Sequence, residues 1–375
     1  MDVTAWMTEH GHEQVVFVAD PAVGLEAVIA IHSTALGPSL GGVRFWHYDT
    51  GDDLVLDVLR LSEAMSLKAA MAGLHQGGGK AVVRWEDPHR SRGPELLAAL
   101  GRAIHELGGR YLAAEDVGAT TADMDGIAAV TPWVTGVSES DGGSGDPSPV
   151  TAVGVHGAMR AAATARWGDP SLRDRHVVVQ GAGHVGAALA QLLVRDGATV
   201  AVADVDEGRV RELVRTIGVD AVPVDDAVTE PCDVLAPCAL GAVVNEKTID
   251  ALHCEIVCGG ANNQLESDAM DDALAERGIL YAPDFVANAG GILNLAEEFH
   301  GYSRERALAA TERIETTTAS VFLAAREWGI APGRAAQRLA RERIAAEALP
   351  GGRWEPGDPA AWTEGQPLTR LRPES

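Results

Sequence analysis

Residues 177–186 read Val-Val-Val-Gln-Gly-Ala-Gly-His-Val-Gly, and this stretch decides the fold class of the chain. Its first four residues are typical of a buried strand, and the six after them fit the pattern G-x-G-x-x-G at the start of a helix. The first glycine permits a tight turn, the second lets the backbone approach a ligand closely, and the third lets the helix pack on the sheet. The stretch therefore predicts a strand, a turn and a helix whose N-terminus receives phosphate groups.

The next predicted strand, Thr199–Ala203, ends in Asp204, eighteen residues after the last glycine of the turn. A carboxylate there accepts both hydroxyls of a ribose and repels a 2′-phosphate, which favours a dinucleotide site and NAD over NADP. Two alternatives remain: a glycine-rich turn of another α/β protein, and NADP binding if Arg209 does not simply face solvent. The residues that we expect to contact NAD here are Gly181, Ala182, Gly183, His184, Val185, Gly186, Asp204 and Val205.

The length of 375 residues and the pattern of elements predict two α/β domains with a cleft between them. Glycine and proline are dense in residues 138–149, which mark the first boundary. We expect a first domain at 1–147, joined by C-terminal helices at about 326–349. We expect a second domain at 148–325, a Rossmann-like, doubly wound sheet that binds NAD. Residues 350–375, rich in proline, are predicted to be a loose tail.

The formal charge of −24 argues against nucleic acid and anionic membranes as partners, because both need a basic surface. No apolar run approaches the roughly 20 residues of a membrane helix. The first fourteen residues contain Asp2, Glu9 and Glu13 but no Lys or Arg, so they do not resemble a signal peptide. We therefore expect a cytoplasmic protein.

The four cysteines are too few for a disulfide scaffold, and they lie in apolar, strand-like runs. They lack the two-residue spacing of zinc ligands. We interpret Cys232, Cys238, Cys254 and Cys258 as reduced core thiols and expect no metal site.

Only three of the thirty basic residues are lysines, namely Lys68, Lys80 and Lys247, and the other 27 are arginines. A guanidinium forms salt bridges but keeps its proton near neutral pH, whereas a buried ammonium can release it. Lys68 continues the apolar stripe of a predicted helix that begins at Asp52 as its N-cap. Lys80 follows three glycines, Gly77 to Gly79, which suggest that the backbone passes close to a ligand. The alternative is chance placement on a solvated face.

These residues belong to a series of motifs that resembles the amino-acid dehydrogenases of the glutamate/leucine/phenylalanine/valine group, most of all the leucine and valine enzymes. The motifs are Gly-Pro-Ser-Leu-Gly-Gly-Val-Arg (37–44), Met-Ser-Leu-Lys (65–68), Gly-Gly-Gly-Lys (77–80), Ala-Glu-Asp-Val-Gly (114–118), Asp-Pro-Ser-Pro-Val-Thr (146–151), Ala-Asn-Asn-Gln (261–264), Tyr-Ala-Pro-Asp (281–284) and Asn-Ala-Gly-Gly (288–291). They occur in order from about residue 30 to 300. The resemblance implies that an L-amino acid, water and NAD give a 2-oxo acid, ammonia and NADH. It also implies a homo-oligomer formed through the first domain.

The resemblance assigns a role to each matching residue. Lys68 would bind the substrate carboxylate, Lys80 would be the general base toward water, and Asp116 would move protons on and off the nitrogen. Burial and the like charge of Lys68 would lower the pKa of Lys80 toward neutrality. Asn262 would bind the amino end of the substrate or the nicotinamide ribose, with Asn288 nearby. Further expected contacts of NAD are Ser148, Thr151, Ala239, Leu240 and Asn262. The structural alternatives are a helix N-cap for Asp116 and plain turn residues for the asparagines.

The substrate class is inferred from a charged side chain that this chain lacks. Glutamate enzymes of this group carry a lysine where this chain has Leu40, next to Gly41, and a carboxylate facing leucine would lack a partner. Ala114 resembles the leucine and valine enzymes, whereas Leu295 is bulkier than the residue common in leucine enzymes. A branched-chain amino acid is therefore favoured, with phenylalanine or tryptophan as the alternative. A catalytically silent NAD-binding regulator is disfavoured because Lys80 and Asp116 are both present. We expect a hinge to close the cleft before hydride transfer.

Overall fold

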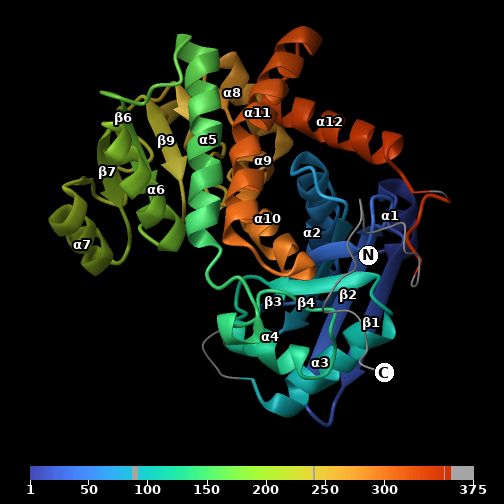
Figure 1. The fold of residues 1–375 in the computed structure, drawn as a ribbon. Helices are drawn as coiled ribbons and strands as arrows, with labels where there is room; N and C mark the ends of the chain where they lie inside the picture. The colour runs from blue at the N-terminus through green and yellow to red at the C-terminus, as the bar shows by residue number, and fades with distance from the viewer. Residues whose placement is uncertain (87–91, 240, 350, 356–375) are drawn as a thin grey trace. The chain divides into compact units, whose positions relative to one another are not determined.

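The computed structural model describes residues 1–86, 92–239, 241–349 and 351–355 (Figure 1). The chain divides into two units, which we describe one at a time. Unit 1 comprises Met1–Gly145, Asn294–Arg304 and Ala340–Ser375, and unit 2 comprises Asp146–Leu293 and Glu305–Leu339.

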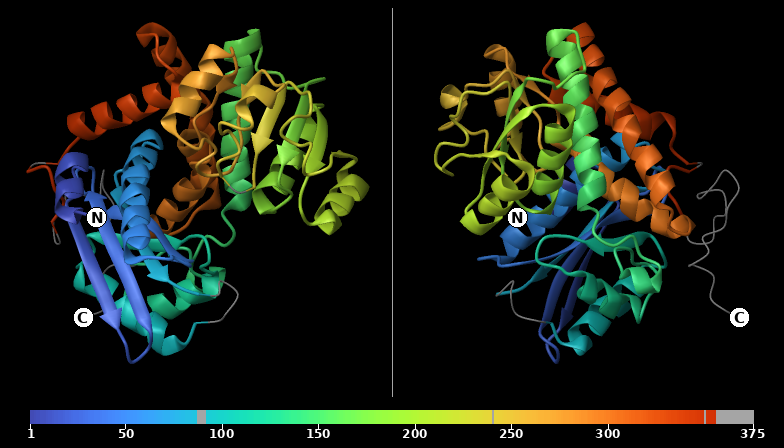
Figure 2. Two further views of the ribbon diagram at one scale, coloured as in Figure 1. Left: turned by 180° about the vertical axis from the view of Figure 1, so that it is seen from behind. Right: turned by 60° about the vertical axis from the view of Figure 1, so that its left-hand side comes forward.

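These bounds differ from the sequence-based expectation at the C-terminal end. Residues 326–339 were expected in the first domain but belong to unit 2, whereas Asn294–Arg304 belongs to unit 1. The reason lies in packing within unit 2, where helix α11 (Arg304–Trp328) lies beside α5 (Ser148–Trp167) (Figures 1 and 2). Arg160 of α5 donates to Glu315 of α11 at 3.2 Å, and beyond α11 Arg334 donates to Asp272 of the same unit at 2.6 Å.

Unit 1 contains a five-stranded sheet in the order β1-β2-β4-β3-β5. Its strands are β1 (Gln14–Asp20), β2 (Leu25–Ser33), β3 (Ser39–Trp46), β4 (Gly77–Arg84) and β5 (Tyr111–Glu115). Strands β1 and β2 form an antiparallel hairpin, and β2 is also antiparallel to β4. Strand β3 is parallel to both β4 and β5, so these three strands end at the same edge of the sheet.

Four helices belong to the first part of unit 1: α1 (Val3–His10), α2 (Gly51–Met71), α3 (Pro94–Glu106) and α4 (Thr121–Ala128). Helix α2 covers one face of the sheet, where Leu54, Val58 and Leu59 pack with Val28 and Val82. Side chains of α3 and α4 form the core on the opposite face. Strand residues alternate between the faces, so Lys80 lies on the α2 face together with Val82.

The N-cap of α2 is Thr50 rather than the expected Asp52. The Thr50 hydroxyl accepts from the backbone of Asp53, and the Asp53 carboxylate accepts from the backbone of Thr50. This reciprocal capping box satisfies two backbone N–H groups at once, which a cap at Asp52 would not do.

The glycine run before Lys80 is needed for packing within the protein itself. A Cβ on Gly77 would stand 1.8 Å from the carbonyl oxygen of Ser33 on β2. One on Gly78 would stand 2.1 Å from the backbone nitrogen of Ser66 on α2. Real Cβ atoms do not approach backbone so closely. The glycines therefore let β4 lie close to both β2 and α2, which brings Lys80 near that helix.

Unit 2 contains six parallel strands in the order β11-β10-β9-β6-β7-β8. They are β6 (His176–Gln180), β7 (Thr199–Ala203), β8 (Asp220–Ala221), β9 (Val234–Pro237), β10 (Ile256–Val257) and β11 (Leu280–Tyr281). The strand order reverses between β6 and β9. This is the doubly wound topology that the sequence predicted, and ligands bind at such a reversal, beyond the carboxyl ends of the strands.

The helices of unit 2 follow its strands and cover the sheet (Figure 2). They include α6 (His184–Asp196), α7 (Glu207–Ile217), α8 (Asp268–Glu276) and α9 (Asp284–Ala287). Helices α10 (Gly290–Ala296) and α12 (Pro332–Ala346) each contribute residues to both units. The core beneath them contains Val178, Leu235 and Val257 from three neighbouring strands.

Part of the predicted tail is packed in unit 1. The backbone of Leu349 donates to the carbonyl of Ala35 at 2.7 Å, and that of Trp354 donates to the Thr34 hydroxyl at 3.1 Å. The Trp354 side chain is buried. The expectation of a loose tail was therefore wrong for residues 351–355, and residues 350 and 356–375 lie outside the described residues.

The four cysteines are unoxidised, and Cys258 is fully buried. Burial raises the pKa of the Cys238 thiol to about 11, so the thiol stays protonated near neutral pH. Among the residues described, no cluster of three His, Cys, Asp or Glu side chains is arranged to hold a metal. None of the helices within the described ranges is long and apolar enough to span a membrane.

The packing of β4 on α2 can be tested with Gly78→Ala. The new methyl group would overlap the backbone of Ser66, so we expect a loss of about 1–3 kcal/mol in the free energy of unfolding. Urea unfolding followed by circular dichroism measures this loss. Gly51→Ala is the matched control, because a Cβ at that exposed helix position meets nothing within 4 Å. Equal stability of the two variants would contradict the packing argument.

Candidate functional site

Two residues that the sequence singled out meet on the α2 face of unit 1. Lys80 is 4% exposed in the middle of β4, and Asp116 directly follows β5. The Lys80 Nζ atom lies 2.8 Å from Asp116 Oδ2. A buried amine and a carboxylate are therefore in direct contact, although the two residues are 36 positions apart in the sequence.

A third charged residue, Arg44 of β3, binds the same carboxylate oxygen. Its Nε donates to Asp116 Oδ2 at 2.9 Å, and its Nη1 donates to Asp57 Oδ2 of α2 at 3.2 Å. The Tyr48 hydroxyl also donates to Asp57, at 2.5 Å. Sequence reasoning missed Arg44, Asp57 and Tyr48 as site residues. The available signal was strand alternation, because Arg44 is two residues beyond Gly42 in a quoted motif and so shares its face.

The electrostatics of this cluster shift both titratable partners. Burial lowers the pKa of Lys80, and the Arg44 charge lowers it further, against the opposing effect of Asp116. Burial alone would raise the pKa of Asp116, but the Lys80 and Arg44 charges outweigh it and hold that pKa well below its usual range. Arg44 is thus a source of like charge on Lys80 that the sequence analysis did not anticipate.

The alternative assignment of Asp116 as a helix N-cap does not hold. Helix α4 begins at Thr121, and its N-cap is Thr120, whose hydroxyl accepts from the backbone of Asp123. The Asp116 carboxylate instead accepts from Arg44 and lies against Lys80.

The other predicted substrate residues of unit 1 lie around the same strands. Leu40 of β3 is 1% exposed and pairs in register with Gly78 and Leu112. Ala114 of β5 is buried and pairs with Gly42.

Three more of these residues complete the unit 1 set. Lys68 is half-buried near the C-terminal end of α2. Gly41 leaves room for the Gly79 carbonyl, since a Cβ there would stand 1.7 Å from that oxygen. Leu295 lies near the end of β5. Its Cδ2 atom and the backbone nitrogen of Glu115 are each 3.5 Å from the position that a Cβ on Gly136 would take.

In unit 2, the glycine turn after β6 has the predicted geometry. Gly181 adopts a φ of 109°, which only glycine tolerates readily, and its N–H donates to the carbonyl of Ala203 at 2.7 Å. A Cβ on Gly186 would stand 1.9 Å from the Gly181 carbonyl oxygen, so this glycine permits close packing. Gly183, the N-cap of α6, has no atom within 4 Å of its Cβ position. The space directly beside Gly183 is therefore open.

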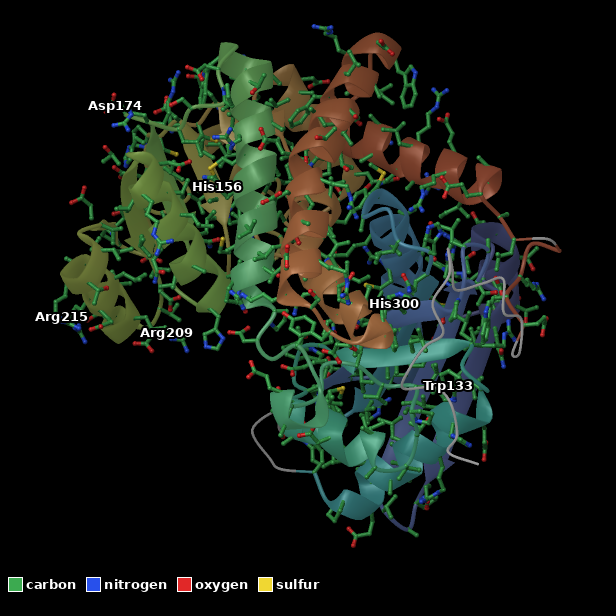
Figure 3. The ribbon with its side chains drawn as sticks, in the orientation of Figure 1. Trp133, His156, Asp174, Arg209, Arg215 and His300 are labelled. Atoms are coloured by element: carbon green, nitrogen blue, oxygen red, sulfur yellow. The ribbon has the colours of Figure 1, made fainter. Side chains whose placement is uncertain are left out.

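Asp204 follows β7 and is fixed by the backbone around it. Its Oδ2 accepts from the N–H of Ala182 in the glycine turn at 2.6 Å, and its Oδ1 accepts from Asp206 at 2.8 Å. Val205 beside it is 87% exposed. Arg209 pairs with Asp206 at 3.4 Å and lies on the outer helix α7 with its side chain 58% exposed (Figure 3).

The remaining predicted cofactor residues lie at the ends of neighbouring elements. Ala239 follows β9, and its backbone nitrogen is 2.7 Å from the Cβ position of Gly181. His184 opens α6, and its Nδ1 lies 3.1 Å from Asp146. Leu240 lies outside the described residues. At the start of α5, the Ser148 N–H donates to Asp146, and the Thr151 hydroxyl donates to the carbonyl of Pro147.

The asparagines belong to a network that links three motifs. The Asn288 side-chain amide, 4% exposed, donates to Asn262 Oδ1 at 2.8 Å. Gln264 donates from its side chain to the carbonyls of Gly259 and Ala261, and from its backbone to Asp284. The buried Asn288 therefore holds the exposed Asn262 in place, and a plain turn residue would not need such a contact.

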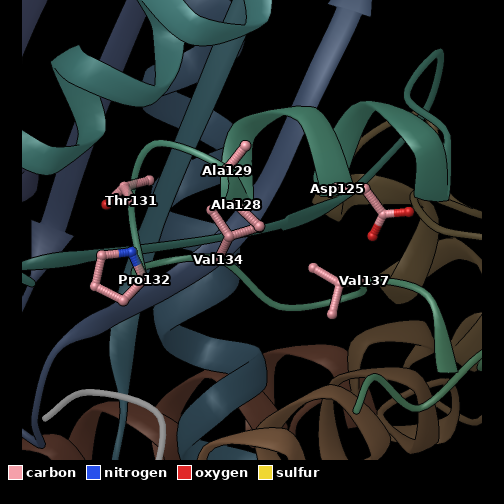
Figure 4. A pocket seen from close by; sticks show the side chains of 7 residues that line it. All are labelled: Asp125, Ala128, Ala129, Thr131, Pro132, Val134 and Val137. Carbon is pink, nitrogen blue, oxygen red and sulfur yellow. The ribbon is translucent and has the colours of Figure 1, made fainter. Parts of the chain in front are cut away.

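A cavity of about 420 Å³ lies elsewhere in unit 1 (Figure 4). It is lined by Asp125, Ala128, Ala129, Thr131, Pro132, Val134 and Val137. None of these is a predicted site residue. The cavity lies beside α4 and the segment after it, so it is not the site assembled around Lys80.

In a comparison with known proteins, two family models match two successive parts of the chain. The model of the Glu/Leu/Phe/Val dehydrogenase dimerisation domain matches residues 12–132, and that of the glutamate/leucine/phenylalanine/valine dehydrogenases matches 142–212 and 205–347. Valine dehydrogenase from Streptomyces albus is 50% identical over 89% of this chain and 93% of its own length. Leucine dehydrogenase from Bacillus cereus is 46% identical over 92% of this chain and 94% of its own length.

Among solved structures, L-tryptophan dehydrogenase from Nostoc punctiforme superposes with a TM-score of 0.81 at 37% identity. The match covers 92% of this chain and 99% of that one. The resemblance inferred from the motifs is thus confirmed along nearly the whole chain. The chain belongs to the Glu/Leu/Phe/Val dehydrogenase family and is an amino-acid dehydrogenase of the NAD(P)-dependent type.

Proposed function

We propose that this protein catalyses the NAD-dependent oxidative deamination of a branched-chain L-amino acid. Water and the amino acid give a 2-oxo acid and ammonia, and the reaction is reversible. The observation that carries the proposal is the buried Lys80 amine in contact with Asp116. Relatives named valine and leucine dehydrogenase, 50% and 46% identical, support the substrate class.

Lys80 is the general base in this proposal. Loss of hydride from the α-carbon leaves an iminium, which water attacks while Lys80 Nζ takes its proton. Only the neutral amine can accept that proton, and burial favours the neutral form. A lowered pKa therefore lets the base work at a pH below the ordinary lysine range.

Two further residues act on the substrate's polar groups. Lys68 binds the α-carboxylate, as a fixed ammonium at the end of α2. The Asp116 carboxylate, ionised in the resting site, receives the proton that Lys80 took from water and passes it to the departing nitrogen, and Lys80 then takes the hydroxyl proton as the carbonyl forms. Its contact with Lys80 lets the proton move between the base and the leaving amine over 2.8 Å.

NAD, when bound, accepts the hydride from the α-carbon. The fit of unit 2 to NAD is supported by the open backbone at Gly183 and by the Asp204 carboxylate after β7. His184, Val185, Ser148, Thr151 and the residues after β9 would surround it. Asn262, held by Asn288, would bind the nicotinamide ribose or the amino end of the substrate.

The substrate side chain would lie against Leu40, Ala114 and Leu295. These apolar side chains offer no partner for a γ-carboxylate, so glutamate is disfavoured. The bulk of Leu295 and the 37% identity to a tryptophan dehydrogenase favour an aromatic substrate as the second candidate. We also propose a cytoplasmic location, because four unoxidised cysteines suit a reducing compartment. A homo-oligomer is proposed because residues 12–132 match the family's dimerisation domain.

The substrate panel is the first test. An apolar wall rewards each buried methylene by about 0.8 kcal/mol, so valine, isoleucine or leucine should exceed alanine in kcat/KM, with glutamate near background. The measurement is NADH formation with each L-amino acid. Ala114→Gly should raise activity on phenylalanine relative to leucine, and Leu40→Lys should reduce branched-chain activity. A wild-type preference for phenylalanine or tryptophan would favour the second candidate, and a preference for glutamate would contradict the pocket.

The base can be tested by Lys80→Arg, which keeps the positive charge but removes the titratable amine. We expect kcat to fall by at least about 100-fold, as is typical when a general base is lost. In the wild type, kcat/KM should rise with pH and level off below the ordinary lysine pKa of about 10.4, because the neutral amine is the active form. Lys68→Ala is the comparison and should act mainly on KM for the amino acid. Near-normal turnover of Lys80→Arg would show that the roles are wrong.

Cofactor choice is tested by steady-state kinetics with NAD and NADP. Asp204 repels a 2′-phosphate, so kcat/KM should be higher with NAD. Asp204→Ala should weaken NAD binding and leave the affinity for the 2-oxo acid nearly unchanged. Arg209→Ala serves as a control, since that side chain is exposed and paired with Asp206. The assignment of Asp204 would be refuted by an equal or better kcat/KM with NADP.

A further inference from the structure

Arg44 lies between two carboxylates on the α2 face of unit 1. It binds Asp116 Oδ2 at 2.9 Å and Asp57 Oδ2 at 3.2 Å, and its side chain is only 16% exposed. A guanidinium keeps its proton throughout the working pH range, so Arg44 cannot take part in proton transfer. Its function must therefore be electrostatic and geometric.

The contact between Lys80 and Asp116 creates a difficulty for a base. An adjacent carboxylate favours the charged form of an amine, typically by 1–3 pH units at such a distance. Only the neutral amine can accept a proton from water. A Lys80–Asp116 pair without other charges would therefore hold the amine in its inactive, protonated form.

The position of Arg44 removes this difficulty. Its Nε binds the same oxygen, Asp116 Oδ2, that Lys80 Nζ contacts at 2.8 Å. The negative charge of Asp116 is thus compensated by a cation that never titrates. The pKa of Lys80 is correspondingly lowered, with burial as the main cause and Arg44 acting in the same direction.

Asp57 and Tyr48 hold Arg44 in this position. Asp57 lies on the first half of α2 and accepts from both the Arg44 guanidinium and the Tyr48 hydroxyl. Asp57 affects Lys80 through its negative charge and through its ion pair with Arg44.

We propose that Arg44 is a positioning residue that frees the Lys80 amine from its carboxylate partner. Its guanidinium, restrained by Asp57, orients the Asp116 carboxylate and compensates its charge, so that Lys80 need not stay protonated to do so. This inference rests on the proposed function, because it gives Arg44 a role toward Lys80 as the base.

The charged groups that face Lys80 come from three elements. Arg44 lies on β3, Asp57 and Lys68 lie on α2, and Asp116 follows β5. On β2, the residue that pairs with Lys80 is the uncharged Ala30. Removing the charge of Arg44 should therefore raise the midpoint at which Lys80 titrates, and removing that of Asp57 should lower it.

The chain suits a direct measurement because it has only three lysines. We would label lysine with ¹³C at Cε, follow each signal against pH by NMR, and assign the signals with Lys68→Arg and Lys247→Arg. In Arg44→Gln the Lys80 midpoint should rise by about one pH unit or more, and in Asp57→Asn it should fall. The acid limb of kcat/KM should move in the same two directions. Arg44→Lys keeps the charge and should restore most of the wild-type midpoint.

Opposite shifts distinguish charge compensation from general structural damage, which would not change sign between the two variants. Shifts in one direction, or none in folded variants, would overturn the inference. Should Arg44→Gln fail to fold, the downward shift in Asp57→Asn alone decides, and an unchanged or higher midpoint refutes it. The NMR titration requires no turnover. A wild type that titrates as expected but forms no NADH with any amino acid would refute the proposed function and not the role of Arg44.

Discussion

The buried contact of Lys80, Asp116 and Arg44 is the interaction on which unit 1 depends. Two cations share one carboxylate oxygen at 2.8 and 2.9 Å in a site where Lys80 is 4% exposed. Uncompensated charges cannot be held in such a place, so all three residues must be placed together. Strand β3 supplies Arg44, strand β4 supplies Lys80, and Asp116 directly follows β5. The glycines before Lys80 let α2, which carries Asp57, pack against this cluster.

Unit 2 differs from unit 1, because its predicted ligand, NAD, needs backbone groups around its phosphates rather than buried charged side chains. The turn after β6 leaves open space beside Gly183, and Asp204 is tied to that turn through Ala182. Asn262 is exposed, and the buried Asn288 donates to its side-chain oxygen, which fixes that side chain. In both units, a short sequence motif depends on contacts with residues that lie far away in the sequence.

Sequence alone predicted the doubly wound sheet and singled out Lys80 and Asp116, since each follows from local pattern or from family motifs. It did not predict the role of Arg44, because only the register of β3 beside β5 brings that side chain to Asp116. The packing role of the glycine run could not be predicted for the same reason, since the atoms that exclude a side chain belong to Ser33 and Ser66. Trp354 likewise docks on Thr34, a contact that spans 320 residues.

The central claim is that the amine of Lys80 acts as the base toward water. Chemical rescue tests it most directly, in the variant Lys80→Ala with branched-chain substrates and a series of small primary amines of different basicity. The account predicts that added amine restores turnover in a saturable manner, and that the restored rate at a given free-base concentration increases with amine pKa, because general-base catalysis follows basicity. Rescue that is absent in a folded variant, or that is independent of amine basicity, would contradict the account.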